Sequence, residues 1–78
     1  MEIKERILKD IEKFSESIKK TEGLELDDKE REIVELAKMY ESDSRSWLGK
    51  GDTDTSFSCI SYAHGLLDSI LKLKGAIE

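Results

Sequence analysis

The sequence predicts an all-α protein, an antiparallel up-down-up bundle of three helices. Apolar residues recur with helical spacing in three segments, at about 2–20, 28–48 and 53–74, and no run alternates with the period of two that a strand needs. The chain contains no proline, so nothing forces a break inside these segments. Its 78 residues suffice for one small domain, which we place over residues 1–78.

The first helix is expected over residues 2–20, where one narrow stripe is apolar. Spacings of four, four, three and four residues place on it Ile3, Ile7, Ile11, Phe14 and Ile18. Glu and Lys fill the opposite side, which is typical of a surface helix. Gly23 follows the segment, and we expect it to end the helix in the left-handed conformation that glycine adopts easily.

The second helix is expected over residues 28–48. Asp27 and Glu30 have the spacing of a capping box, with Asp in place of the usual Ser or Thr. One face collects the apolar side chains, namely Ile33, Leu36, Ala37, Tyr40, Trp47 and Leu48. Ser44 lies near the centre of this face, and we expect its hydroxyl to donate to the carbonyl of Tyr40 one turn earlier.

The third helix is expected over residues 53–74, after a short turn in which Gly49 stops the second helix and Asp52 caps the third. Asp68 is the one formal charge from Thr55 to Leu71, and more than half of the circumference is apolar. The first and second helices are short and would cover only part of so wide an apolar surface on the third. We therefore predict a protein partner or a homodimer contact on the side of Cys59, Leu66 and Leu73.

Charge and composition argue against several classes of protein. The net charge is −5, and Lys19 and Lys20 form the main basic cluster, which does not favour nucleic acid. No run approaches the roughly 20 apolar residues of a membrane helix, so we expect no membrane contact. The first ten residues lack the apolar core of a signal peptide, and a lone Cys59 cannot form an internal disulfide. We expect a cytoplasmic protein.

Five polar residues form a candidate cluster: Asp43, Ser44, Tyr62, His64 and Asp68. His64 and Asp68 are four residues apart on one helix, so their side chains can meet. A carboxylate that orients an imidazole recurs in catalytic and metal sites. A small-ligand-binding or hydrolytic site on Asp43, His64 and Asp68 is therefore our alternative hypothesis. We favour the structural interpretation, a histidine hydrogen-bonded to its partner on the same helix.

No complete catalytic or metal-binding set emerges from the residues. Zinc needs three or four ligands and the chain has one histidine, so we expect no metal and no cofactor. The Gly49–Thr53 segment lacks the spacing of a phosphate-binding loop and the strand before it. We predict no catalytic residues, and our leading hypothesis is a non-enzymatic protein-interaction or self-association module.

Residues 40–69 resemble a known family. The pattern Tyr40-x-x-Asp-x-x-x-Trp-Leu-x-x-Gly-Asp52, followed by Ile60-Ser-Tyr-Ala-His-Gly-Leu-Leu-Asp68, is similar to the short archaeal proteins of the domain-of-unknown-function family DUF357. The resemblance implies a small, cytoplasmic, all-helical archaeal protein, and it implies no activity. Thr53 and Ser69 depart from the pattern, where an aromatic or larger residue and an alanine are expected.

Overall fold

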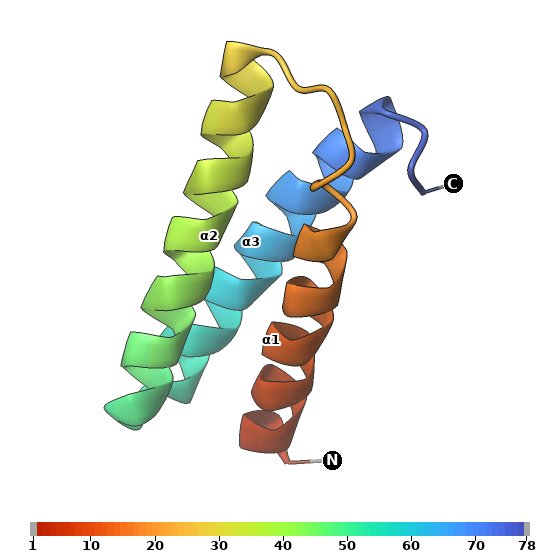
Figure 1. Ribbon diagram of the computed structural model, residues 1–78. Coiled ribbons are helices and arrows are strands. Elements are labelled where there is room, and N and C mark those ends of the chain that lie inside the picture. The colour runs from red at the N-terminus through yellow and green to blue at the C-terminus, as the bar shows by residue number, and fades with distance from the viewer. Residues whose placement is uncertain (1, 78) are drawn as a thin grey trace.

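The structure is a computed structural model that describes residues 2–77. Helix α1 spans Ile3–Lys19, α2 spans Asp28–Gly49 and α3 spans Thr53–Leu73. The chain runs up α1, down α2 and up α3, so α2 is antiparallel to both other helices (Figure 1). No strand occurs among the described residues, and the predicted three-helix bundle is confirmed. The helix ends differ from the predicted ones by one residue at most, which is the usual uncertainty of helix boundaries.

A tight glycine turn connects α2 to α3. Gly49, which we expected to stop the helix after residue 48, is the last residue of α2, and Gly51 takes the left-handed conformation with a φ of 83°. The N–H of Gly51 donates to the carbonyl of Leu48 at 3.0 Å. The N–H of Asp52 donates to the carbonyl of Trp47, also at 3.0 Å, and the two bonds form a Schellman motif. This short connection makes α2 and α3 antiparallel neighbours.

Side-chain caps start α2 and α3 as predicted. The Asp27 carboxylate accepts from the N–H of Glu30 at 2.7 Å, and the Glu30 carboxylate accepts from the N–H of Asp27 at 3.0 Å, which completes the capping box. The Asp52 carboxylate accepts from the N–H of Thr55 at 3.0 Å and from its hydroxyl at 2.8 Å. These bonds, the backbone one foremost, lower the pKa of Asp52 below its ordinary value.

Helix α1 ends differently from the prediction. Lys20 closes the helix in the right-handed conformation, and the Thr21 hydroxyl donates to the carbonyl of Ile18 at 2.7 Å. Gly23 does not adopt a positive φ, so the predicted left-handed glycine cap is wrong. Backbone N–H groups of Lys20, Thr21 and Glu22 donate to the carbonyls three residues earlier, so the last turn tightens and its carbonyls are satisfied without a left-handed residue.

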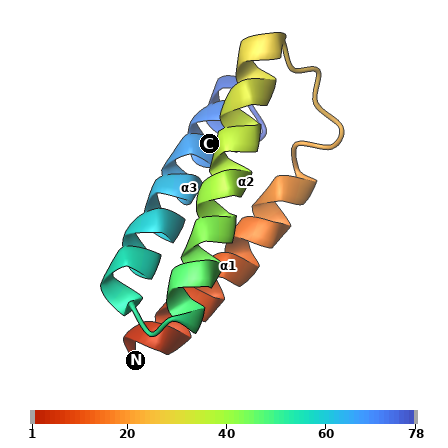
Figure 2. The same cartoon turned by 90° about the vertical axis from the view of Figure 1, so that its left-hand side faces the viewer.

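The core lies around α3. Its buried apolar side chains come from all three helices and are Ile7, Ile11, Phe14, Val34, Ala37, Ile60, Ala63, Leu67, Ile70 and Leu71. Helix α3 has its most extensive contacts with α2 and fewer with α1, whereas α1 and α2 touch each other little. Figure 2 shows α1 on one side of the α2–α3 pair, and the opposite side carries no helix.

Two fully buried serines join α2 to α3. The Ser44 hydroxyl donates to the carbonyl of Ser56 at 2.8 Å, and the Ser56 hydroxyl donates to the carbonyl of Ser44 at 2.7 Å. The predicted bond from Ser44 to Tyr40 is therefore wrong, because Ser56 offers a partner across the helix pair. No buried side-chain nitrogen or oxygen within residues 2–77 lacks a hydrogen-bond partner.

An ion pair connects the start of α2 to the end of α3. The Lys74 ammonium lies 2.8 Å from Oε1 of Glu30. Its hydrogen bond, followed by the one from the Asp27 N–H, lowers the pKa of Glu30 below the ordinary value of 4.5. Since the folded state has the lower pKa, these contacts stabilise the fold above the unfolded-state pKa. That contribution is lost as the pH falls through the folded-state pKa.

Replacing Glu30 by glutamine is expected to make the free energy of unfolding less dependent on pH in the acidic range. The variant cannot lose a proton, so its free energy of unfolding should change less between about pH 7 and about pH 3 than that of the natural chain. Urea unfolding at both pH values measures this. Glu35→Gln is the matched control, because the Glu35–Lys38 pair is exposed on α2 alone. Identical pH profiles for Glu30→Gln and the natural chain would contradict the prediction.

Candidate functional site

His64 is half-buried on the side of α3 that faces α1. Its Nε2 lies 2.7 Å from the carbonyl oxygen of Asp10, and its ring meets Phe14 edge to face, with 5.7 Å between the centroids. A carbonyl oxygen only accepts, so Nε2 carries the proton and Nδ1 is the acceptor of the neutral ring. The bond within α3 that we favoured for His64 is thus replaced by a bond to α1. Asp68, one turn further along α3, is exposed.

Asp43 lies on a different side of α3 from His64. It is exposed on α2 and close enough to Cys59 to act on the thiol. Burial foremost, and then the negative charge of Asp43, raises the pKa of Cys59. Cys59 and His64 are five residues apart, so they point about 140° apart around the helix. The structure does not bring Asp43 and His64 together.

The other two members of the predicted cluster lie apart as well. Tyr62 is 52% exposed and pairs with Tyr40 of α2, with 4.7 Å between the ring centroids and 71° between the planes. Ser44 is buried in its bonds with Ser56. Within residues 2–77, no group of three His, Cys, Asp or Glu side chains is arranged to hold a metal ion.

The predicted interface residues lie on the side of the α2–α3 pair opposite α1. The Tyr40–Tyr62 contact fixes the register of the two antiparallel helices there. One turn further along the pair, Leu36 of α2 therefore comes to the height of Leu66 of α3. We call this surface the open face and define it by Leu36, Met39, Tyr40, Cys59, Tyr62, Leu66 and Leu73. Tyr62, Met39 and Leu73 are its most exposed members, at 52%, 62% and 75%.

On this side of α2, sequence reasoning assigned two partly exposed residues to the core and gave no role to a third. Leu36 and Trp47 were placed on the buried face of the second helix, but each is 38% exposed. Both lie at the edge of that face, away from α1, so the described helices leave part of each side chain in solvent. Met39 received no role, although its place three residues after Leu36 is a signal for the same side of the helix.

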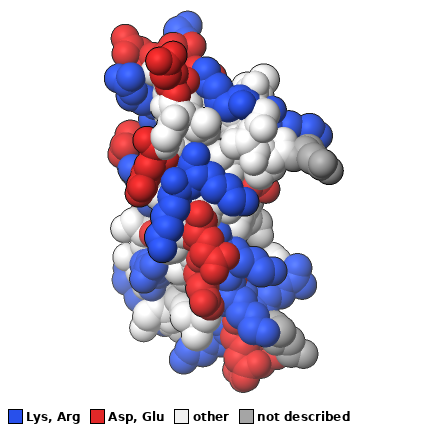
Figure 3. All heavy atoms as spheres, turned by 45° about the vertical axis from the view of Figure 1, so that its right-hand side comes forward, with Lys and Arg blue, Asp and Glu red and all other residues white. Residues whose placement is uncertain are grey.

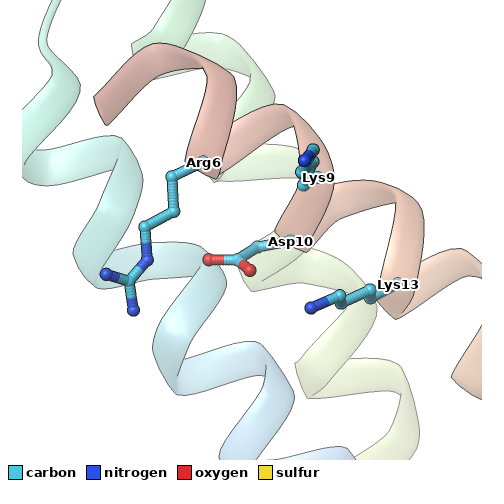
Figure 4. Close-up of a pocket in the computed structure, with 4 residues that line it drawn as sticks. All are labelled: Arg6, Lys9, Asp10 and Lys13. Atoms are coloured by element: carbon cyan, nitrogen blue, oxygen red, sulfur yellow. The ribbon is translucent and has the colours of Figure 1, made fainter. Parts of the chain in front are cut away.

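The side of the molecule that carries α1 is charged. Figure 3 shows Lys, Arg, Asp and Glu side chains mixed over it. A pocket on α1 is lined by Arg6, Lys9, Asp10 and Lys13 (Figure 4). The Arg6 guanidinium lies over the ring of Phe57, 5.1 Å from its centroid. The Asp10 carboxylate lies among the three cations and offsets one of them, so the lining keeps two positive charges in excess.

The described residues define the class of the protein: a small antiparallel three-helix bundle with an apolar open face. A comparison with protein families gives a match over residues 6–75 to the model described as "Protein of unknown function (DUF357)". The chain belongs to this family, as the motifs between Tyr40 and Asp68 predicted. No curated protein matches the chain. Within residues 2–77, no helix is long and apolar enough to span a bilayer.

Proposed function

We propose that this chain is a non-enzymatic protein-interaction module and that it docks through the open face. The observation that carries the proposal is the Tyr40–Tyr62 pair, with Tyr62 52% exposed, flanked one turn along the helix pair by Leu36, which is 38% exposed, and by the half-buried Leu66. Contiguous exposed apolar side chains on a small protein mark interaction sites more often than single ones do. Aromatic residues and methionine are also enriched at the centres of protein interfaces.

The distribution of charge supports the same surface. Charged residues make up 40% of the chain, yet Asp68 is the one formal charge between Thr55 and Leu71. Charge is depleted at the centres of interfaces, because ions that become buried there must be paired. A charged protein with one nearly uncharged helix, part of it in solvent, therefore fits a surface that another molecule covers.

The geometry gives less support to a small-ligand or hydrolytic site on Asp43, His64 and Asp68. Nε2 of His64 is engaged by the Asp10 carbonyl, and Asp43 lies on another side of α3. A working acid or base needs its partners within hydrogen-bond reach. We therefore propose the interaction role over this alternative. A cytoplasmic location and an archaeal source stay predictions.

The test introduces charge into the open face. Met39→Lys and Leu73→Lys are combined in the full chain, and Leu8→Lys on α1 is the control, since Leu8 is 50% exposed outside the open face. A protein retained from a lysate of the source organism is purified, and its affinity for each variant is measured by calorimetry. We expect the open-face variant to bind at least about tenfold more weakly and the control to bind like the natural chain.

Two outcomes would overturn the proposal. One is an affinity that the control lowers as much as the open-face variant does, with all variants equally helical by circular dichroism. The other is a chain that retains no protein and stays monomeric in light scattering at every concentration. In either case the open face would be an ordinary surface of this bundle.

A further inference from the structure

Helix α3 has a strip of solvent-exposed residues along its length, which we call the outward strip. It begins with an acidic residue and ends with a basic one. Asp54 and Lys72 are 18 residues apart, which is five helical turns, so they lie on one line about 27 Å apart. Between them, the exposed residues from about 20° on the α1 side of this line to about 60° on its other side are uncharged and small: Ser58, Ser61, Gly65 and Ser69. Asp68 lies about 40° to one side of the line, toward α1. Tyr62 of the open face lies within about 20° of Ser69, so the strip adjoins that face.

Two of the three hydroxyls of the strip, those of Ser58 and Ser69, have partners within α3. Ser58 Oγ donates to the carbonyl of Asp54 at 3.1 Å, and Ser69 Oγ donates to the carbonyl of Gly65 at 2.8 Å. Covering these serines would therefore leave neither hydroxyl donor unpaired. Such a strip can be buried against another helix at little cost in hydrogen bonds.

Gly65 has no packing role within the chain. It lies in the middle of α3 without a positive φ, and a Cβ placed on it would meet no atom within 4 Å. Glycine inside a helix costs about 0.5–1 kcal/mol relative to alanine, so the fold alone would be more stable with alanine here. Close approach of a second backbone is the use that glycine has at such a position.

The charges on and around the strip indicate which partner it fits. Two copies of a chain with a net charge of −5 repel each other over most of their surfaces. The strip has Asp68 at its α1 edge, is otherwise uncharged in its middle and carries opposite charges at its two ends. An antiparallel pair therefore brings Asp54 of each copy to Lys72 of the other, whereas a parallel pair would set like charges together. In an antiparallel pair with a two-fold axis, the same Asp54–Lys72 contact forms at both ends of the strip.

We propose that the partner at this face is a second copy of this chain, with the two α3 helices antiparallel about a two-fold axis that crosses the outward strip at the height of Ala63, whose own side chain is buried on the core side of α3. This inference rests on the proposed interaction role and names its partner. Gly65 lies within one turn of the axis, and the open-face residues Tyr62 and Leu66 flank it. The complex is a homodimer with the small residues of the strip and the adjoining Tyr62 at its centre and two Asp54–Lys72 pairs at its ends.

Charge reversal in the full chain tests the orientation. Asp54→Lys alone sets lysine against lysine, and Lys72→Asp alone sets aspartate against aspartate. Sedimentation from about 1 µM to about 1 mM should show each variant dimerising at least about tenfold more weakly than the natural chain. An equal mixture of the two variants should dimerise again, because each copy then finds opposite charges. Asp28→Lys and Lys19→Glu are controls in the first turn of α2 and the last turn of α1, and they should change nothing.

Several results would overturn the dimer. They are a natural chain that stays monomeric throughout this range, a mixture that remains as weak as its components, and controls that weaken dimerisation equally. Gly65→Leu dimerising like the natural chain would contradict the close approach near the axis. A monomeric chain that still binds another protein through the open face would remove the dimer and leave the proposed interaction role intact. If the chain neither dimerises in sedimentation nor binds another protein in calorimetry, both proposals are wrong.

Discussion

Replacing Leu67 by alanine is expected to lower the free energy of unfolding by about 2–5 kcal/mol. Leu67 is fully buried in the middle of α3, the helix on which both other helices pack. The substitution removes buried apolar surface and leaves a cavity that the neighbouring side chains fill only in part. A domain of this size buries only about 60% of the surface of its unfolded chain, so little stability is held in reserve. Urea unfolding followed by circular dichroism measures the loss.

Leu73→Ala is the matched control for this prediction. The same atoms are removed from the same helix, but Leu73 is 75% exposed. We expect its free energy of unfolding to stay within about 0.5 kcal/mol of that of the natural chain at low protein concentration, where a dimer would dissociate. Equal losses at Leu67 and Leu73 would contradict the assignment of the core to the inner side of α3.

Local patterns predicted the helices and most of their ends. Asp27 and Glu30 form the capping box that their spacing indicated, and Asp52 caps α3. These features depend on neighbours within four residues, so a single sequence contains what is needed to predict them. Gly23 shows the limit of such reasoning. Backbone bonds that span three residues satisfy the last carbonyls of α1, the Thr21 hydroxyl adds one more donor, and the left-handed glycine conformation is not needed.

Contacts between helices were the part that the sequence could not predict. Ser44 has a carbonyl within reach on its own helix, and only the register of α2 against α3 determines that Ser56 is its partner instead. His64 likewise has Asp68 one turn away, but it bonds to Asp10, which is 54 residues distant in the chain. Helical periodicity places a residue on a face, and it does not say which residue of the next helix lies at the same height.

The candidate interface was predicted in part. Cys59, Leu66 and Leu73 were placed together because the apolar arc of the third helix is wider than its neighbours can cover. The contribution of α2 was missed, because Leu36 was assigned to the core. That assignment assumed that the bundle covers the whole apolar face of α2. Since α1 packs chiefly on α3 and touches α2 little, one edge of that face stays in solvent.

Replacing His64 by alanine is expected to lower the free energy of unfolding by about 1–3 kcal/mol, the sum of one hydrogen bond and one aromatic contact. Within residues 2–77, the bond to Asp10 is the one side-chain hydrogen bond that joins α1 to another helix. The loss of this bond should therefore loosen the packing of α1 on α3 more than the packing of α2 on α3. Amide hydrogen exchange should become faster in α1 than in α2, which keeps its contacts with α3.

His64→Gln and His64→Phe separate the two contributions. The glutamine amide can reach the Asp10 carbonyl as a donor and restores the hydrogen bond without the ring, whereas phenylalanine keeps the edge-to-face contact with Phe14 and cannot donate. Each should recover part of the stability that alanine loses, and each should slow exchange in α1 again. If His64 served a ligand instead, alanine would leave α1 unchanged and neither replacement would matter.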